Sequence, residues 1–205
     1  MTTHLIARLL RPVRAGVNHT IWHNHAANMA PEAITITSGA FDDGCAIPRR
    51  HAGLGVGDNI SPPLQWSGVP ADTAELVLII EDPDVPLPRP IVHGLVAGID
   101  PHLRELPEGA LTLSEANAAP AVTPGLALQI GFGSFKRRGY AGPRPIPGHG
   151  PHRYIFQIFA LDRPSGLDYT ATLPRALSAI DGKVIARGRL TGTYERARFR
   201  RNDAG

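Results

Sequence analysis

Residues 148–162 read GHGPHRYIFQIFALD, in which a loop rich in glycine and proline leads into a hydrophobic run. Side chains two residues apart on a β-strand point to the same face of the sheet. His152 and Tyr154 are therefore expected to share a face, with Phe156 and Ile158 further along it. Two hydrogen-bonding groups above an apolar wall predict a pocket at the beginning of a buried strand.

Several other segments have the pattern of β-strands, and one late segment has the pattern of a helix. Residues 76–80 are apolar on both faces, which predicts a central strand covered on both sides. Residues 172–183 predict a helix, with Pro174 near its start and Gly182 after its end. Because strands and helices do not alternate regularly, the order favours a mainly β sandwich with one or two peripheral helices over a doubly wound fold. The remaining predicted strands cover residues 33–38, 91–100, 154–161 and 183–195.

The composition is typical of one globular domain with many turns. The chain has 205 residues, of which 42% are hydrophobic, and it contains 22 glycines and 20 prolines. Cys45 is the single cysteine, so no internal disulfide can form, and this usage favours a reducing compartment. The formal net charge of +3 comes from the two ends of the chain: residues 187–201 hold six arginines against Glu195. We interpret this basic end as a solvated tail rather than a specific nucleic-acid site.

The sequence contains few signals for other classes of protein. We find no zinc-ligand spacing, P-loop or glycine-rich nucleotide fingerprint, and we expect no metal or cofactor. His19, His23 and His25 cluster in sequence without an acidic or cysteine partner, so we interpret them as part of a polar arm. No run approaches the roughly 20 apolar residues that cross a bilayer. The N-terminus lacks the uninterrupted apolar core of a signal peptide, and we therefore expect a cytoplasmic protein.

Titratable groups follow or begin three of the predicted strands. Asp82 and Asp84 come directly after the run 76–80, and alternation places Asp82 on the face of Leu76, Leu78 and Ile80. His93 lies near the beginning of the next strand, as His152 and Tyr154 do for a third. These groups place an acid, two imidazoles and a phenol at the ends of predicted strands.

The combination resembles the phosphatidylethanolamine-binding protein family, and it is most similar to the bacterial branch of Raf kinase inhibitor-like proteins. The resemblance covers about residues 34–194. It rests on GDNISPPLQW (57–66), DPDVP (82–86), His93 and GYAGPRPIPGHGPHRY (139–154), which occur in this order. The resemblance implies a large central antiparallel sheet packed on a smaller sheet, with an anion pocket at one edge. The ligand-binding residues that it implies are Asp82, His93, Gly142, Pro143, His152 and Tyr154.

The sequence departs from this family in two respects. Gly94 follows His93 where family members commonly have an aromatic residue, which predicts a wider or less well packed pocket. The resemblance also leaves both ends of the chain unexplained. We therefore divide the chain into an N-terminal extension with a short helix (1–32, helix over 2–11), the family-like domain (33–194) and a basic tail (195–205). Leu5, Leu9, Leu10 and Trp22 are too apolar to lie free in water, and they are expected to pack on the core or on a second copy in a homodimer.

These observations predict a binding protein rather than an enzyme. Its ligand is expected to be phosphate, a phospholipid head group or another small anion, held by N–H groups of the two imidazoles and of the glycine-rich loop. Lys136, Arg137, Arg138 and Arg144 in the same loop are candidates for raising the local positive potential. Two alternatives remain open: a regulator that inhibits a kinase or protease through its surface, and a hydrolase that uses the same pocket.

Overall fold

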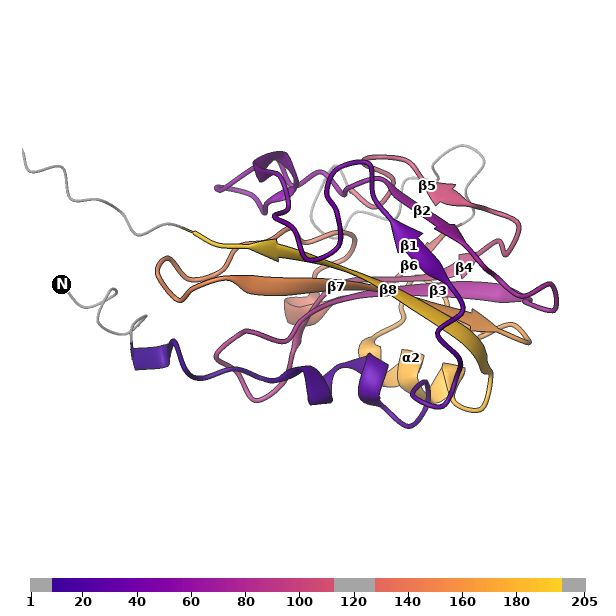
Figure 1. Cartoon of the computed structure of the whole chain (residues 1–205). Helices are drawn as coiled ribbons and strands as arrows, with labels where there is room; N and C mark the ends of the chain where they lie inside the picture. Colours follow the sequence, from indigo (N-terminus) through magenta and orange to yellow (C-terminus); the bar gives the residue numbers. More distant parts are fainter. Residues whose placement is uncertain (1–8, 113–127, 197–205) are drawn as a thin grey trace, which may run out of the picture.

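Two antiparallel β-sheets form the body of the protein in the computed structural model, which describes residues 9–112 and 128–196 (Figure 1). The central sheet has five strands in the order β6–β4–β3–β7–β8, and the smaller sheet has three in the order β1–β2–β5. The predicted mainly β sandwich, with a large sheet packed on a smaller one and a peripheral helix, is confirmed. The strands are β1 (Thr35–Thr37), β2 (Leu64–Ser67), β3 (Glu75–Asp82), β4 (Ile91–Ile99), β5 (Glu105–Leu106), β6 (Gln129–Ile130), β7 (His152–Leu161) and β8 (Val184–Tyr194).

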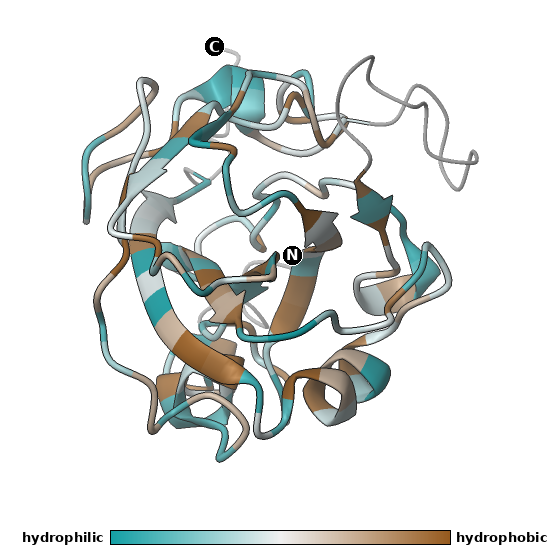
Figure 2. Cartoon of the chain, turned by 90° about the vertical axis from the view of Figure 1, so that its right-hand side faces the viewer, coloured by the Kyte–Doolittle hydropathy of each residue, from teal (hydrophilic) through white to brown (hydrophobic). Residues whose placement is uncertain are grey.

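Strand β3 lies at the centre of the large sheet, and every one of its residues is buried. Its register with β7 pairs Leu78 with Ile158 and Ile80 with Phe156, so the apolar stripes of the two strands lie side by side. These stripes face the small sheet and form one hydrophobic core with residues such as Trp66. In Figure 2 the hydrophobic colour is concentrated on the strands in the middle of the molecule. The predicted central strand is thus present, and it is covered on both sides.

The opposite face of the large sheet is covered by helix α2 (Leu173–Ile180) and by the N-terminal part of the chain (Figure 1). Pro174 lies in the first turn of α2, and Gly182 after its end has φ = 65°, as the sequence pattern predicted. Ala176 and Ile180 of the helix pack on Val77 and Ile79, which point to this side of β3. The described residues also contain four short 3₁₀ turns: η1 (Val17–His19), η2 (Ile21–His23), η3 (Arg49–His51) and η4 (Ser134–Lys136).

Residues 10–32, which we call the arm, run along this second face of the large sheet. The indole of Trp22 is 3% exposed and lies 6.4 Å, between ring centroids, from Phe159. The prediction that the basic end of the chain is solvated is wrong at Arg187, whose guanidinium lies 4.1 Å from the centre of the Trp22 ring and donates to the Trp22 carbonyl. Arg187 is buried because it belongs to β8, beside the arm. Leu9, directly before the arm, is 69% exposed and does not show the packing expected of it, and Leu5 lies outside the described residues.

The sequence pattern predicted no strand at β2, β5 or β6, which have only two to four residues each. Although β2 follows Pro62 and Pro63, its residues Leu64 and Trp66 are buried, and Ile36 of β1 pairs with Trp66. The predicted helix over 2–11 lies almost entirely outside the described residues, as does the basic tail beyond residue 196. Across residues 9–112 and 128–196, no helix is long and apolar enough to cross a lipid bilayer.

Glu81 attaches the arm to the large sheet from a fully buried position. Its Oε2 accepts hydrogen bonds from the backbone N–H of Ile21 at 2.8 Å and from the side-chain amide of Gln157 at 2.9 Å. Burial raises the pKa of Glu81 from 4.5 to about 6, although both hydrogen bonds oppose this change. Folding therefore favours the neutral carboxyl. Its contribution to stability is complete below pH 4.5 and is lost as the pH rises through about 6.

We predict that Glu81→Gln increases stability at neutral pH and leaves it nearly unchanged at acidic pH. The amide oxygen of glutamine can accept both hydrogen bonds without ionising, and a pKa change from 4.5 to about 6 corresponds to about 2 kcal/mol. Urea unfolding between about pH 4 and pH 8 measures the difference. The control is Glu108→Gln on the surface, which should leave the pH dependence intact. A wild-type stability that does not fall across this range would contradict the assignment.

Candidate functional site

A cavity of about 420 Å³ opens at one end of the inner strands of the large sheet, where β3 ends and where β4 and β7 begin. Antiparallel pairing brings these three strand ends together, although they are far apart in sequence. Five of the six predicted site residues line this cavity: Asp82, His93, Gly142, His152 and Tyr154. Pro143 is not among the lining residues; its carbonyl accepts a hydrogen bond from the Gly53 N–H and joins two loops.

Asp82 and His152 form the floor of the cavity, and both are almost completely buried. Asp82 Oδ1 accepts from the backbone N–H of Asp84, and Oδ2 lies 2.8 Å from Nδ1 of His152. The other ring nitrogen of His152, Nε2, lies 2.7 Å from Nδ1 of His149. Because both nitrogens of His152 already have protein partners, this ring has no N–H left for a ligand. The expectation that both imidazoles donate to the ligand is therefore wrong for His152.

His93 is the imidazole that remains available. Its Nδ1 lies 2.5 Å from the carbonyl oxygen of Ala141, and a carbonyl can only accept, so Nδ1 carries the proton. Its Nε2 is buried and has no hydrogen-bond partner in the described part of the chain. Burial lowers the pKa of His93, and the charge of Asp82 opposes this effect in part. A neutral His93, whose ring belongs to the cavity lining, thus keeps a lone pair on Nε2 that no group in the described part of the chain uses.

Tyr154 supplies the phenol. It is buried, and its ring meets that of His93 edge to face with 5.0 Å between ring centroids. Burial raises the pKa of Tyr154, and the nearby charge of Asp82 raises it further. The hydroxyl therefore stays protonated at physiological pH, and its hydrogen bond is directed to the carboxylate of Asp82.

Gly142 allows two loops to approach each other beside the cavity. A Cβ at this position would lie 2.2 Å from the carbonyl oxygen of His51, so only glycine fits. Its N–H donates to Asn59 Oδ1 at 2.8 Å, and the N–H of Gly148 donates to the carbonyl of Arg196. The expectation that glycine N–H groups face the ligand is therefore wrong at these two positions. Gly94 does not leave a gap either, because a Cβ there would lie 3.0 Å from Cδ1 of Ile80.

The mouth of the cavity combines positive charge with apolar surface. Arg137 and Arg144 line it, together with Leu87 and Phe135, whose side chains are 41% and 73% exposed. Phe135 has φ = 59°, a left-handed conformation that is unfavourable for a residue with a bulky side chain. This arrangement suits a ligand that has both an anionic and an apolar part.

Asp84 holds the loop after β3 against β7 and the arm. Its carboxylate accepts two hydrogen bonds from the Arg153 guanidinium, at 2.8 and 2.7 Å, and lies 3.0 Å from the guanidinium of Arg14. Burial would raise the pKa of Asp84, but the hydrogen bonds and charges of the two arginines outweigh it and hold the pKa below its usual value. Asp84 thereby fixes the segment that carries Asp82.

Sequence reasoning missed the role of His149 and the contribution of the arm. His149 was visible in the motif that contains His152, but its spacing of three residues does not predict contact between two residues at the start of a strand. Its Nε2 lies 2.9 Å from the backbone carbonyl of Leu10, a contact that no side-chain pattern can reveal. Among the described residues, no three His, Cys, Asp or Glu side chains are arranged to hold a metal ion.

Comparisons with known proteins agree on one family. The family model described as phosphatidylethanolamine-binding protein matches residues 37–195. A UPF0098 protein of Chlamydia trachomatis serovar D is 38% identical over 168 residues, which cover 78% of this chain and 98% of the relative. A UPF0098 protein of Aquifex aeolicus is 35% identical over 162 residues, 78% of this chain and 88% of the relative.

Two crystal structures have the same fold. That of CT736 from Chlamydia trachomatis, a homologue of phosphatidylethanolamine-binding protein, has a TM-score of 0.68 and 35% identity, covering 80% of this chain and 99% of its own. That of YbcL from E. coli, a member of the mammalian PEBP family, has a TM-score of 0.70 and 28% identity, covering 80% and 98%. The match extends over the strands that build the cavity.

We predict that Asp84→Asn destabilises the protein by roughly 2 kcal/mol at about pH 7, the value of a charge-assisted hydrogen-bond pair. For a chain of this size, the melting temperature should fall by roughly 4–8 °C. The contribution of Asp84 is present above its unfolded pKa of 3.8 and is lost as the pH falls through its lower folded value. The difference between the variant and the wild type should therefore shrink at about pH 3. Asp162→Asn, which removes an exposed carboxylate paired with Arg163, is the control and should change the melting temperature little. An equal effect of both variants would contradict the role of Asp84.

Proposed function

The chain belongs to the phosphatidylethanolamine-binding protein family, and we propose that it binds small anionic ligands of the phosphate type in the cavity at the ends of β3, β4 and β7. The proposal covers phosphorylated head groups as well as free phosphate. It is a binding role without turnover of the ligand. The observation that carries it is the lining residue His93, whose buried Nε2 has no partner among residues 9–112 and 128–196, in a cavity that Arg137 and Arg144 also line.

An unpartnered buried nitrogen is costly unless a ligand satisfies it, since a buried polar group without a hydrogen bond loses about 1–3 kcal/mol. The Ala141 carbonyl keeps the proton of neutral His93 on Nδ1, so Nε2 can only accept. A phosphate monoanion fits this requirement because one of its oxygens carries a proton that it can donate to Nε2. A dianion fits only when His93 takes up a proton and becomes a donor. Both routes give the same complex. This complex contains one more proton than a neutral His93 and a free phosphate dianion contain together.

The side chains around the cavity favour binding over catalysis. Ser134 lines the cavity, but its hydroxyl oxygen accepts a hydrogen bond from the backbone N–H of Val92 at 2.9 Å. Cys45 is exposed and is not among the lining residues. His152, the natural candidate for a general base, has both ring nitrogens bonded within the protein. These contacts support a cavity that holds a ligand without attacking it.

We predict that binding of inorganic phosphate takes up close to one proton per site at about pH 8 and less as the pH approaches 6, where the ligand already carries that proton. Titration calorimetry in two buffers with different ionisation enthalpies measures the uptake. His93→Ala should weaken binding by about ten- to a hundredfold, the effect of losing a charge-assisted hydrogen bond of about 1.5–3 kcal/mol.

His93→Gln is the matched control, because its amide can donate a hydrogen bond without a change of protonation. It should retain more affinity than His93→Ala and take up no proton. Phosphate binding that is equally tight in wild type and His93→Ala would overturn the proposal.

We also predict that a phosphate monoester with a short alkyl chain binds more tightly than inorganic phosphate. Each buried methylene contributes about 0.8 kcal/mol, so two of them should increase affinity by about tenfold. Phe135→Ser should reduce this preference and leave the affinity for inorganic phosphate within about twofold, because the ring lies at the mouth and not at the floor. Met29→Ser, which changes another exposed apolar residue, controls for general effects of surface polarity. An alkyl ester that binds no more tightly than inorganic phosphate would contradict this account of the mouth.

A further inference from the structure

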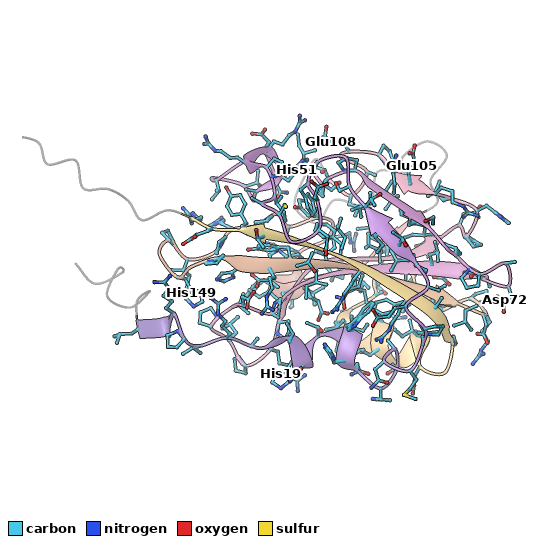
Figure 3. The ribbon with its side chains drawn as sticks, in the orientation of Figure 1. His19, His51, Asp72, Glu105, Glu108 and His149 are labelled. Atoms are coloured by element: carbon cyan, nitrogen blue, oxygen red, sulfur yellow. The ribbon has the colours of Figure 1, made fainter. Side chains whose placement is uncertain are left out.

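A chain of three hydrogen bonds connects the floor of the cavity with the arm. Asp82 Oδ2 lies 2.8 Å from His152 Nδ1, His152 Nε2 lies 2.7 Å from His149 Nδ1, and His149 Nε2 lies 2.9 Å from the carbonyl oxygen of Leu10. All three side chains are almost completely buried. Figure 3 shows His149 between the arm and the beginning of β7. Two imidazole rings therefore connect the cavity to the arm.

These three hydrogen bonds determine how many protons the side chains of Asp82, His152 and His149 contain together. Each hydrogen bond contains one proton, and the carbonyl of Leu10 can only accept. An ionised aspartate with two neutral histidines supplies two protons, which is one too few. The complete chain therefore requires a third proton, and it makes the net charge of the three side chains zero instead of −1.

The third proton belongs on His152. The Leu10 carbonyl requires a proton on His149 Nε2, which leaves Nδ1 of a neutral His149 free to accept from His152. Burial lowers the pKa of His149, although the backbone hydrogen bonds to Leu10 and Val13 oppose this effect in part, so His149 is the neutral ring. His152 then donates from both nitrogens, to Asp82 and to His149, as an imidazolium.

The surrounding charges are compatible with this assignment. Arg14 and Arg153 lie on the arm side of the pair, and both are bound to the carboxylate of Asp84, which offsets part of their positive charge. His93 is neutral because burial lowers its pKa. The titratable and charged groups around the two rings are Asp82, Asp84, His93, Arg153 and Tyr154 from the domain, and Arg11 and Arg14 from the arm.

We propose that the arm sets the charge of the anion cavity: the backbone carbonyl of Leu10 selects the tautomer of His149 and thereby keeps His152 doubly protonated. His149 is a positioning residue, since it does not line the cavity and acts through His152. This inference rests on the proposed function, and it makes anion binding dependent on whether the arm is docked. Without the carbonyl, His149 can shift its proton to Nδ1 and donate to a neutral His152, which adds one negative charge next to the anion.

The arm is held at this place by contacts with the loop that follows Asp82. The N–H of Ala15 donates to the carbonyl of Val85 at 2.9 Å, and the N–H of Gly16 donates to that of Pro83 at 2.8 Å. Arg14 adds an ion pair with Asp84 and a hydrogen bond to the carbonyl of Pro151. These bonds lie within a few residues of Leu10, so substitutions here can release the carbonyl from His149 while Asp82 and His152 keep their side chains.

The test uses the full chain with ¹⁵N-labelled histidine, and NMR reports the protonation of each ring nitrogen at about pH 7 without phosphate. In the wild type, we expect two protonated nitrogens on His152 and one, Nε2, on His149. His149→Phe removes the acceptor and should leave His152 neutral, whereas His149→Gln, with an amide oxygen to accept and an amide N–H to donate, should keep His152 doubly protonated.

Ala15→Pro and Arg14→Ala release the arm and should shift His152 towards the neutral form. Arg175→Ala removes the same charge on α2 and should not.

Binding of inorganic phosphate is then measured with the same proteins. We expect His149→Phe and Ala15→Pro to weaken it by about tenfold, the effect of one proton at the cavity floor, and His149→Gln and Arg175→Ala to stay within about threefold of wild type. A neutral His152 in the wild type, or a doubly protonated His152 in both His149→Phe and Ala15→Pro, would overturn the inference. Failure of the wild type to bind phosphate would instead overturn the proposed function, and the NMR result would still decide the charge of the pair.

Discussion

The hydrogen bond between Asp82 and His152 is the interaction on which the geometry of the site depends. It exists because β3 and β7 pair antiparallel in the centre of the large sheet, with Glu81 opposite Ile155 at the end of the ladder. A slip of one residue in this register would turn the side chains of one strand to the other face and separate the two groups. The apolar stripes fix the register, because they must face the small sheet. Burial of the core thus determines where the polar groups meet.

The same burial explains why the polar side chains of the site depend on one another and do not act as independent groups. Asp82, His152 and His149 are taken out of water together, and each can be accommodated only with its partners satisfied. His93 differs, since one of its nitrogens is left without a partner at the cavity. The two imidazoles therefore differ in role. His152, at the floor, has hydrogen-bond partners at both nitrogens and supplies charge, whereas His93 can form a hydrogen bond with a ligand. Asp84 and its two arginines hold the loop between these groups in place.

Prediction from sequence succeeded where a pattern of side chains reflects local backbone geometry. The continuous apolar run at 76–80 and the pattern of 154–161 identified two strands, and alternation placed Asp82 on one face of the first and His152 and Tyr154 together on one face of the second. It failed where tertiary contacts override local signals. No strand was predicted at β2, which follows two prolines, and Arg187 was assigned to a solvated end although it stacks on Trp22. The role of the arm was not predictable, since its contacts with the domain are largely made by backbone N–H and carbonyl groups that every residue possesses.

The amino-acid sequence alone determined the sheet-forming segments, the family and five residues that line the cavity, because periodicity and motif spacing depend only on the order of side chains. Only the tertiary structure decided which nitrogens are available. Within the described residues, His93 Nε2 has no hydrogen-bond partner, whereas both ring nitrogens of His152 have one, although the two histidines were equivalent candidates in the sequence. The physical reason is that a hydrogen bond depends on direction and on the groups that surround it. The carbonyls of Ala141 and Leu10 come from distant parts of the chain, and they assign the protons of His93 and His149 only after folding has placed them.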